Sequence, residues 1–248
     1  MKARKLEICC GDIESCRAAV NGGADRIELC SALSVGGLTP SKAFIEAAVS
    51  IRQTTDIHVL IRPREGDFLY SPDEVAIMLE DIRTAKEAGA QGVVIGALNS
   101  DGSIDLEATR VMVEMAGDMN VTFHRAFDLS RDLKESLETI ISTGCNRVLT
   151  SGGAATALDG ANTLRELNEF SNGRITILGG CGVTPENAEN ILKISGINEL
   201  HASARSQIKS RMCFRRTGVA MGKDDSEEYS RMITDINKVK LLAQKILQ

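Results

Sequence analysis

The sequence predicts a single-domain TIM barrel, in which eight parallel strands close into a ring and alternate with helices. Three observations lead to this prediction. Short β-rich runs recur along the chain with helical patterns between most of them. The chain has 248 residues, a common length for α/β barrels. Several runs end in histidine or in charged side chains, and the active sites of barrels lie at the carboxyl ends of their strands.

The expected strands are short runs of β-branched and aliphatic residues. They cover residues 6–10, 26–30, 58–64, 92–98, 121–127, 147–152, 175–182 and 199–204. A doubly wound open sheet is the rival architecture, but such a sheet would not normally need eight equivalent units. We therefore prefer the barrel and assign residues 1–248 to one domain.

Helix starts and stops support this division. A hydroxyl side chain stands just before a proline at Thr39-Pro40, Ser71-Pro72 and Thr184-Pro185, which predicts a helix start at each place. Ser71 also forms a capping-box pattern with Glu74. Several helical patterns stop at a glycine, and the next strand follows within a few residues in G-A-D-R-I-E-L, G-A-Q-G-V-V-I and G-C-N-R-V-L-T. This recurring joint is a weak internal repeat of a βα unit.

Two connections are longer than a barrel needs. Residues 65–71 follow the third expected strand, and residues 205–227 follow the eighth. Because loops that follow strands line the catalytic face of a barrel, both are candidate lids or ligand loops, and an oligomer contact is an alternative role for the second. Residues 228–247 place Met232, Ile236 and Val239 on one apolar stripe, which predicts a final packing helix.

Composition and motifs exclude several classes of protein. The net charge of −5 has mixed signs and there is no basic run, so we expect no nucleic-acid partner. No stretch resembles a signal peptide or a membrane span. The seven cysteines are spread along the chain, which predicts free thiols in a reducing compartment and a cytoplasmic protein. Apart from Lys5, no lysine falls in an expected strand, so a Schiff-base aldolase is not expected, and no Walker or dinucleotide fingerprint occurs.

Glutamate and cysteine alternate at the ends of the first two expected strands. Glu7 and Cys9 share one face of the first strand, and Glu28 and Cys30 share one face of the second. Because consecutive barrel strands are neighbours, these four side chains can form one small patch, whereas Cys10 points the other way. Cys9 and Cys30 are either two small buried residues or a pair of soft sulfur ligands suited to Cu(I).

Two arginines follow each other at the end of the third expected strand. Arg62 and Arg64 share one face of that strand, with Pro63 between them. Guanidinium groups at a strand end suit bidentate binding of a carboxylate or phosphate group. Neutralising Glu7 and Glu28 in a buried charge network is the alternative role, and both roles can hold at once.

Two histidines stand on expected strands that carry further polar side chains. His124, followed at the rim by Asp128, is the best candidate for a general acid or base because imidazole titrates near neutrality. His201 shares a face of the eighth expected strand with Ser203 and Arg205. Since the eighth strand closes the barrel beside the first, His201 can approach Glu7. The candidate catalytic set is Glu7, Glu28, Arg62, Arg64, His124, Asp128 and His201.

Turns rich in glycine and hydroxyl groups follow the sixth and seventh expected strands. In barrels, the loops after strands seven and eight often bind phosphate through backbone N–H groups, and glycine lets a ligand come close to the backbone. Such turns also occur for purely steric reasons. The candidate anion site consists of Ser151, Gly152, Gly179, Gly180, Ser203 and Arg205.

Several long motifs of this sequence resemble those of the CutC family, a family of copper homeostasis proteins. They are L-E-I-C at 6–9, G-A-D-R-I-E-L-C at 23–30, G-G-L-T-P at 36–40, I-R-P-R-E-G-D-F-L-Y at 61–70, V-T-F-H-R-A-F-D at 121–128, R-V-L-T-S-G at 147–152 and H-A-S-A-R at 201–205. The resemblance implies a TIM barrel, a cytoplasmic homo-oligomer and an association with copper. It places the proposed Cu(I) cysteines of the family at Cys9 and Cys30, and the chain departs from the family pattern at Cys10, Glu65 and Cys181.

Two functions agree with these residues. The first is a cytoplasmic copper-binding protein that uses Cys9 and Cys30. The second is an isomerase, lyase or hydrolase of a small phosphorylated or carboxylated metabolite, with Glu28 as the base and His124 as the acid. The family resemblance favours the copper-binding protein. A Cu(I) carrier needs only two or three soft ligands, so the residue chemistry of the arginines and histidines at the strand ends favours the enzyme as the alternative.

Overall fold

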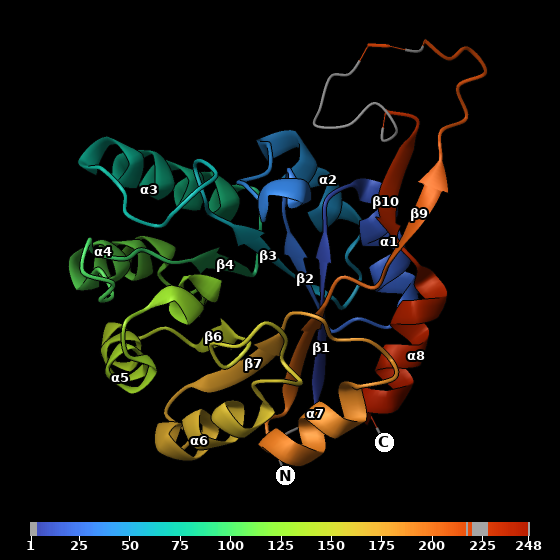
Figure 1. Ribbon diagram of the computed structural model, residues 1–248. Helices are drawn as coiled ribbons and strands as arrows, with labels where there is room; N and C mark the ends of the chain where they lie inside the picture. The colour runs from blue at the N-terminus through green and yellow to red at the C-terminus, as the bar shows by residue number, and fades with distance from the viewer. Residues whose placement is uncertain (1–3, 217, 220–227, 248) are drawn as a thin grey trace.

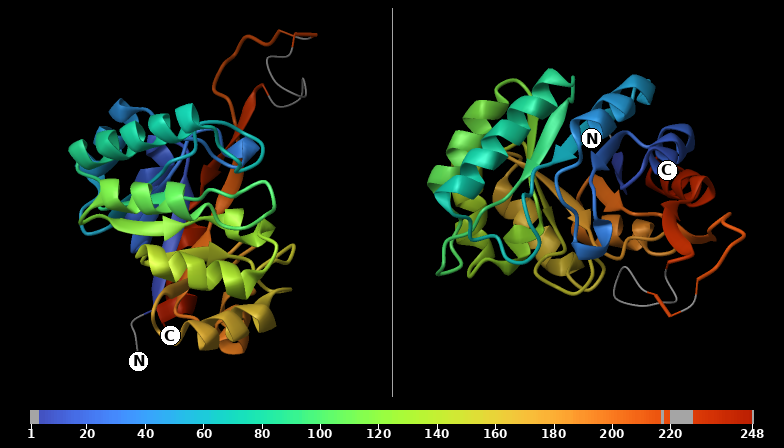
Figure 2. Two further views of the ribbon diagram at one scale, coloured as in Figure 1. Left: turned by 90° about the vertical axis from the view of Figure 1, so that its left-hand side faces the viewer. Right: turned by 90° about the horizontal axis from the view of Figure 1, so that it is seen from above.

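The computed structural model describes residues 4–216, 218–219 and 228–247. Its strands β1 to β8 form a closed parallel barrel in chain order, and helices surround them (Figure 1). The predicted TIM barrel is therefore confirmed, and the open-sheet alternative is wrong. Figure 2 shows the helices packed around the outside of the strands.

The barrel strands are short, as the sequence predicted, but most end earlier. They are β1 (Lys5–Cys10), β2 (Arg26–Leu29), β3 (Asp56–Leu60), β4 (Gly92–Ile95), β5 (Asn120–Phe123), β6 (Arg147–Thr150), β7 (Thr176–Gly180) and β8 (Glu199–Ala202). Backbone conformation explains two of the early ends. Cys181 and Ala204 have positive φ angles of 85° and 46°, which an extended strand cannot contain.

The helices alternate with these strands. They are α1 (Ile13–Gly22), α2 (Lys42–Ile51), α3 (Pro72–Glu87), α4 (Leu106–Ala116), α5 (Leu133–Thr143), α6 (Ala161–Ser171), α7 (Ala188–Ser195) and α8 (Ile236–Leu247), with short 3₁₀ helices η1 (Leu33–Val35) and η2 (Arg125–Leu129). The capping box at Ser71 is confirmed. The starts predicted at Thr39 and Thr184 are wrong, because Ser41 caps α2 and Asn187 precedes α7.

The repeated joint before the strands has a common structural role. The joint is a glycine, a small residue and a polar residue, and this polar residue is Asp25, Gln91 or Asn146 in its three copies. The side chain of each accepts a hydrogen bond from the backbone N–H of a residue in the preceding barrel strand, at 2.8, 2.9 and 2.7 Å. The joint therefore fixes the register of neighbouring strands, which is why the same pattern recurs.

The carboxyl-terminal part departs from the prediction. Residues 228–247 do not form one helix, because β10 (Ser230–Thr234) precedes α8 and pairs antiparallel with β9 (Arg205–Lys209). Met232 is 49 % exposed on this hairpin, so it does not continue the packing stripe of α8. The hairpin projects beyond the barrel (Figure 1). Of the loop predicted at 205–227, residues 217 and 220–227 lie outside the described residues.

The barrel strands separate two kinds of side chain. Apolar residues such as Ile8, Ile27 and Val148 face the helices and belong to the main hydrophobic core. The buried polar residues Glu7, Arg26 and Arg147 belong to the alternate positions of the same strands, which face the barrel interior. The barrel interior is therefore charged, and these charged side chains support the site at the carboxyl ends of the strands.

Candidate active site

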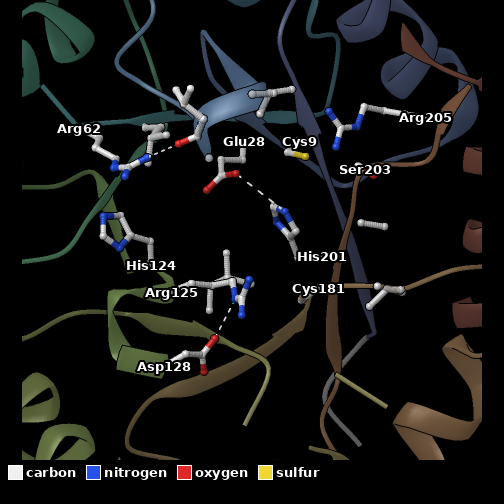
Figure 3. A pocket seen from close by; sticks show the side chains of 18 of the residues that line it. Cys9, Glu28, Arg62, His124, Arg125, Asp128, Cys181, His201, Ser203 and Arg205 are labelled. Carbon is white, nitrogen blue, oxygen red and sulfur yellow. Dashed lines mark hydrogen bonds and ion pairs between the residues drawn. The ribbon is translucent and has the colours of Figure 1, made fainter. Parts of the chain in front are cut away.

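A cavity of about 600 Å³ opens at the carboxyl ends of the barrel strands. Its polar lining comes from strands and loops far apart in the sequence. In Figure 3, Glu28 and His201 point toward one another, Arg62 and His124 lie on one side, and Arg205 lies on another. Ionisable side chains from separate segments therefore converge at one mouth, as the sequence predicted.

Three potential ligand groups lie at the centre of this mouth. The thiol of Cys9, a carboxylate oxygen of Glu28 and an imidazole nitrogen of His201 are all within 4.8 Å of one another. They come from β1, β2 and β8, which are neighbours in the closed barrel. We call these residues the mouth cluster.

Glu7 sets the orientation of His201. The two residues are register partners across β1 and β8, and Nδ1 of His201 lies 2.7 Å from Oε1 of Glu7. The other ring nitrogen, Nε2, lies 3.8 Å from Oε2 of Glu28. The expected approach of His201 to Glu7 is thus confirmed, and it leaves Nε2 available at the cavity.

Burial and charge set the protonation of these groups. Burial alone lowers the pKa of His201, but the charge of Glu28 and hydrogen bonds to Cys9 and Glu7 raise that pKa well above its ordinary value. Burial raises the pKa of Glu28, while His201 opposes this rise. For Glu7, the Arg26 guanidinium and His201 outweigh burial and hold the pKa well below its ordinary value. His201 is therefore an imidazolium ion beside two acidic groups at neutral pH.

A buried ion network supports the mouth cluster from inside the barrel. Nε of Arg26 donates to Glu7, and its terminal nitrogen lies 2.7 Å from Oε2 of Glu199. Arg147 pairs with the same Glu199 oxygen at 3.2 Å. Sequence reasoning missed Arg26, Arg147 and Glu199. The sequence did contain a signal for the two arginines, because Arg26 and Arg147 each begin a strand directly after the repeated glycine joint.

His124 lines the cavity but is held in a neutral state. Its Nδ1 accepts a hydrogen bond from the N–H of Ala126 at 3.1 Å, and its Nε2 has no partner in the described part of the chain. Burial, with the charge of Arg62 nearby, lowers the pKa of His124 to about 3. A neutral imidazole packed against Phe68, with ring centroids 4.8 Å apart, is a poor proton donor at neutral pH.

Arg62 and Arg64 do not share a face, so that prediction is wrong. Arg62 is buried at the cavity wall and donates to the backbone oxygens of Val35, Gly37 and Gly66. Arg64 lies outside the cavity lining and pairs with Glu74. The reason is that β3 ends at Leu60, so both arginines follow the strand and lose its alternation. Neither of these arginines neutralises Glu7, because Arg26 takes that role.

The glycine turns are not arranged as predicted either. Asp128 accepts hydrogen bonds from the N–H groups of Ser151 and Gly153, and the N–H of Gly152 donates to Thr150. These amides are therefore not free to hold an anion. Gly179 and Gly180 lie inside β7 and do not line the cavity. A Cβ atom on Gly179 would come within 2.6 Å of Ile197, so packing explains this glycine.

Two other members of the predicted anion site do reach the cavity. Ser203 and Arg205 line it, directly after β8, and Asp128 lines it beside Arg125. Arg125 was not among the predicted site residues although it stands next to His124, and its Nε donates to Asp128 at 2.7 Å. Gly182, Val183 and Thr184, just beyond the predicted glycine pair, also line the cavity.

Cys30 is not a member of the mouth cluster, although it contacts one member, Glu28. It is 1 % exposed, packs with Leu60 and Val94, and its thiol lies 3.6 Å from Oε2 of Glu28. Burial, followed by the charge of Glu28, raises the pKa of the Cys30 thiol well above its ordinary value. All seven cysteines are free. Within the described residues, no helix combines the length and the hydropathy that crossing a membrane requires.

The fold and the cavity define a TIM-barrel protein with a cavity lined by charged side chains at the carboxyl ends of its strands. The sequence model of the CutC family matches residues 4–206, and the chain belongs to this family. A family protein CutC of Bacteroides fragilis is 49 % identical over 97 % of this chain and 96 % of its own length. Its counterpart in Bacteroides thetaiotaomicron is 48 % identical over 96 % of each chain.

A solved structure of the same family agrees with the fold. It is a CutC protein of Streptococcus agalactiae that is named for copper homeostasis. It is 32 % identical to this chain, has a TM-score of 0.77 and covers 80 % of this chain and 97 % of its own. The β9–β10 hairpin and α8 lie beyond the residues that the family model matches, with only the first two residues of β9 inside the matched range.

Proposed function

We propose that this protein is an isomerase, lyase or hydrolase that acts on a small anionic metabolite in the barrel mouth. The observation that carries the proposal is His201, which Glu7 orients and Glu28 faces, at the wall of a cavity of about 600 Å³. An acidic group and an imidazolium ion side by side are the pair that proton transfer requires. A purely structural histidine has no need of such a cavity.

The residues divide into reacting and binding groups. Glu28 in its carboxylate form takes a proton from the substrate, and Nε2 of His201 gives a proton to the atom that gains electrons. Glu7 is a positioning residue, because it contacts His201 and not the cavity. Arg125 and Arg205 line the cavity and supply positive charge that matches an anionic substrate. His201 replaces His124 as the proposed acid, because His124 is neutral.

A metabolite screen followed by one substitution tests this function. A thermal-shift screen of phosphorylated and carboxylated metabolites is expected to give a stabilising compound that the protein converts. Glu28→Gln is expected to lower turnover by about 100-fold or more while the thermal shift by that compound persists, because the amide keeps the shape but cannot take a proton. The matched control Glu166→Gln, at an exposed ion pair, should leave turnover unchanged. Equal turnover in Glu28→Gln and the parent would refute the proposed base.

Copper binding is the second candidate, and the mouth cluster is the observation that favours it. Thiolate and imidazole are soft enough ligands for Cu(I), and Cys9 and His201 approach one another with Glu28. The pair expected from the family resemblance fits less well, because Cys30 is protonated, buried and directed at Glu28. Copper would therefore be held by Cys9 and by His201, which would have to release its proton, rather than by two cysteines.

Anaerobic Cu(I) titration separates these ligand sets. Cys9→Ser is expected to lose stoichiometric tight binding, whereas Cys30→Ser keeps it, since Cys30 lies outside the cluster. The opposite pattern, with binding lost only in Cys30→Ser, would contradict this assignment. If neither substitution changes binding, neither cysteine is a copper ligand and this assignment fails.

We also propose a cytoplasmic location and a homo-oligomeric state, as the family resemblance implied. Seven free cysteines support a reducing compartment. The exposed apolar side chains Met212 and Phe214, 59 % and 65 % exposed beyond β9, support a contact with another copy. Sedimentation of the purified chain measures the oligomeric state, and a monomer at micromolar concentration would contradict it.

A further inference from the structure

Two polar side chains at the rim beyond β8 have no partner among the described residues. Ser203 and Arg205 line the cavity and are only partly exposed. No hydrogen bond or ion pair among the described residues involves the Ser203 hydroxyl or the Arg205 guanidinium. Arg205 differs in this from Arg62 and Arg125, whose guanidinium groups donate to backbone oxygens and to Asp128. A half-buried guanidinium with unused donors at a cavity is suited to an anion.

The neighbouring loop beyond β7 supplies further donors. Gly182 and Val183 line the same cavity, and within the described residues their backbone N–H groups take part in no hydrogen bond. This contrasts with the loop beyond β6, where Asp128 accepts from Ser151 and Gly153. Because β7 and β8 are adjacent in the barrel, the two loops border one stretch of the rim.

We propose that Arg205, Ser203 and the Gly182–Val183 backbone form a subsite for the phosphate group of a phosphate monoester substrate. The proposal rests on the proposed function, because it names the substrate class of the same cavity. Guanidinium, hydroxyl and amide donors from two loops suit a tetrahedral group with three terminal oxygens. A planar carboxylate has only two oxygens and would leave some of these donors unused.

The subsite also gives the substrate a direction. The phosphate group lies at the rim on the side of β7 and β8, so the carbon skeleton extends across the cavity toward Glu28 and His201. The reaction then occurs at a carbon or oxygen atom of the skeleton, while the phosphate group serves for binding. Such a division lets binding energy of a non-reacting group position the reacting one.

Binding of inorganic phosphate, measured by calorimetry, tests the subsite without any turnover. Arg205→Ala is expected to weaken phosphate binding by about 10- to 100-fold, the range for a lost charge-assisted hydrogen bond. Ser203→Ala should weaken it less, and Arg205→Lys should recover part of the loss. The matched control Arg231→Ala, on the same hairpin but paired with Asp12 and Glu14, should bind phosphate as the parent does.

Further measurements distinguish a failure of this subsite from a failure of the proposed function. Glu28→Gln should keep its phosphate affinity even if it loses turnover, so failure of the catalytic assignment leaves the subsite standing. Sulfate should compete with phosphate, whereas acetate should not. The proposal is overturned if Arg205→Ala, shown to be folded by an unchanged melting temperature, binds phosphate as tightly as the parent. It is also overturned if acetate binds with equal affinity in an Arg205-dependent way, because the subsite would then be one for carboxylates.

Discussion

Replacing Arg26 by methionine is expected to lower the free energy of unfolding by about 3–5 kcal/mol. The substitution removes one cation that contacts both Glu7 and Glu199 inside the barrel, where Arg26 is 2 % exposed. The two carboxylates would be left with His201 and Arg147 as their remaining partners. Uncompensated buried charge is among the most costly changes that a single substitution causes. Denaturant titration at neutral pH measures the loss.

The control for this substitution is Arg83→Met on the outer face of α3. Arg83 is 54 % exposed and pairs with Glu80 and Glu87. Exposed ion pairs contribute about 0–1 kcal/mol, so the control should be nearly neutral. A loss below about 1 kcal/mol in Arg26→Met as well would mean that the interior charges adapt to the missing cation, for example by taking up protons.

The second large effect is expected in the titration of His201. Its pKa in the folded chain should lie well above the ordinary imidazole value of about 6.5, because the charge of Glu28 and the hydrogen bonds to Cys9 and Glu7 outweigh burial. Glu28→Gln removes the largest of the raising influences, so the pKa of His201 should fall clearly. Nuclear magnetic resonance of the imidazole nitrogens measures both values. A His201 that titrates at or below 6.5 in the parent would contradict the charge arrangement of the mouth.

The same shift has a consequence for stability. A histidine whose pKa is raised on folding stabilises the native state fully below its unfolded pKa, near 6.5, and this stabilisation is lost as the pH rises through the raised folded value. The parent should therefore lose stability between neutral and alkaline pH. Glu28→Gln should show a smaller loss in that window, because less of the shift remains.

Residue patterns alone predicted the barrel and the contact between its first and last strands. The repeated joints marked the βα units, and the period of two within a strand put Glu7, Cys9 and Glu28 on the interior face. Closure of β8 against β1 then brought His201 to Glu7, as expected from chain order alone. These inferences depend only on local period and on ring closure, which is why they could be made without coordinates.

The parts that could not be predicted depend on where strands end and on which donors are already used. The roles of Arg62 and Arg64 diverged because β3 stops at Leu60. The turn beyond β6 looked suited to an anion, yet Asp128 occupies its amides, and only tertiary structure shows this. Likewise, the β9–β10 pairing overrode a helical stripe in the sequence, because strand pairing is a non-local interaction.

The most direct measurement is a crystal structure of the chain with a phosphorylated compound from the metabolite screen. We expect the phosphate oxygens within about 2.7–3.2 Å of donors from Arg205 and Ser203, and the carbon skeleton against Glu28 and Nε2 of His201. The account is contradicted if the compound binds elsewhere on the molecule, or if Glu28 and His201 turn away from it.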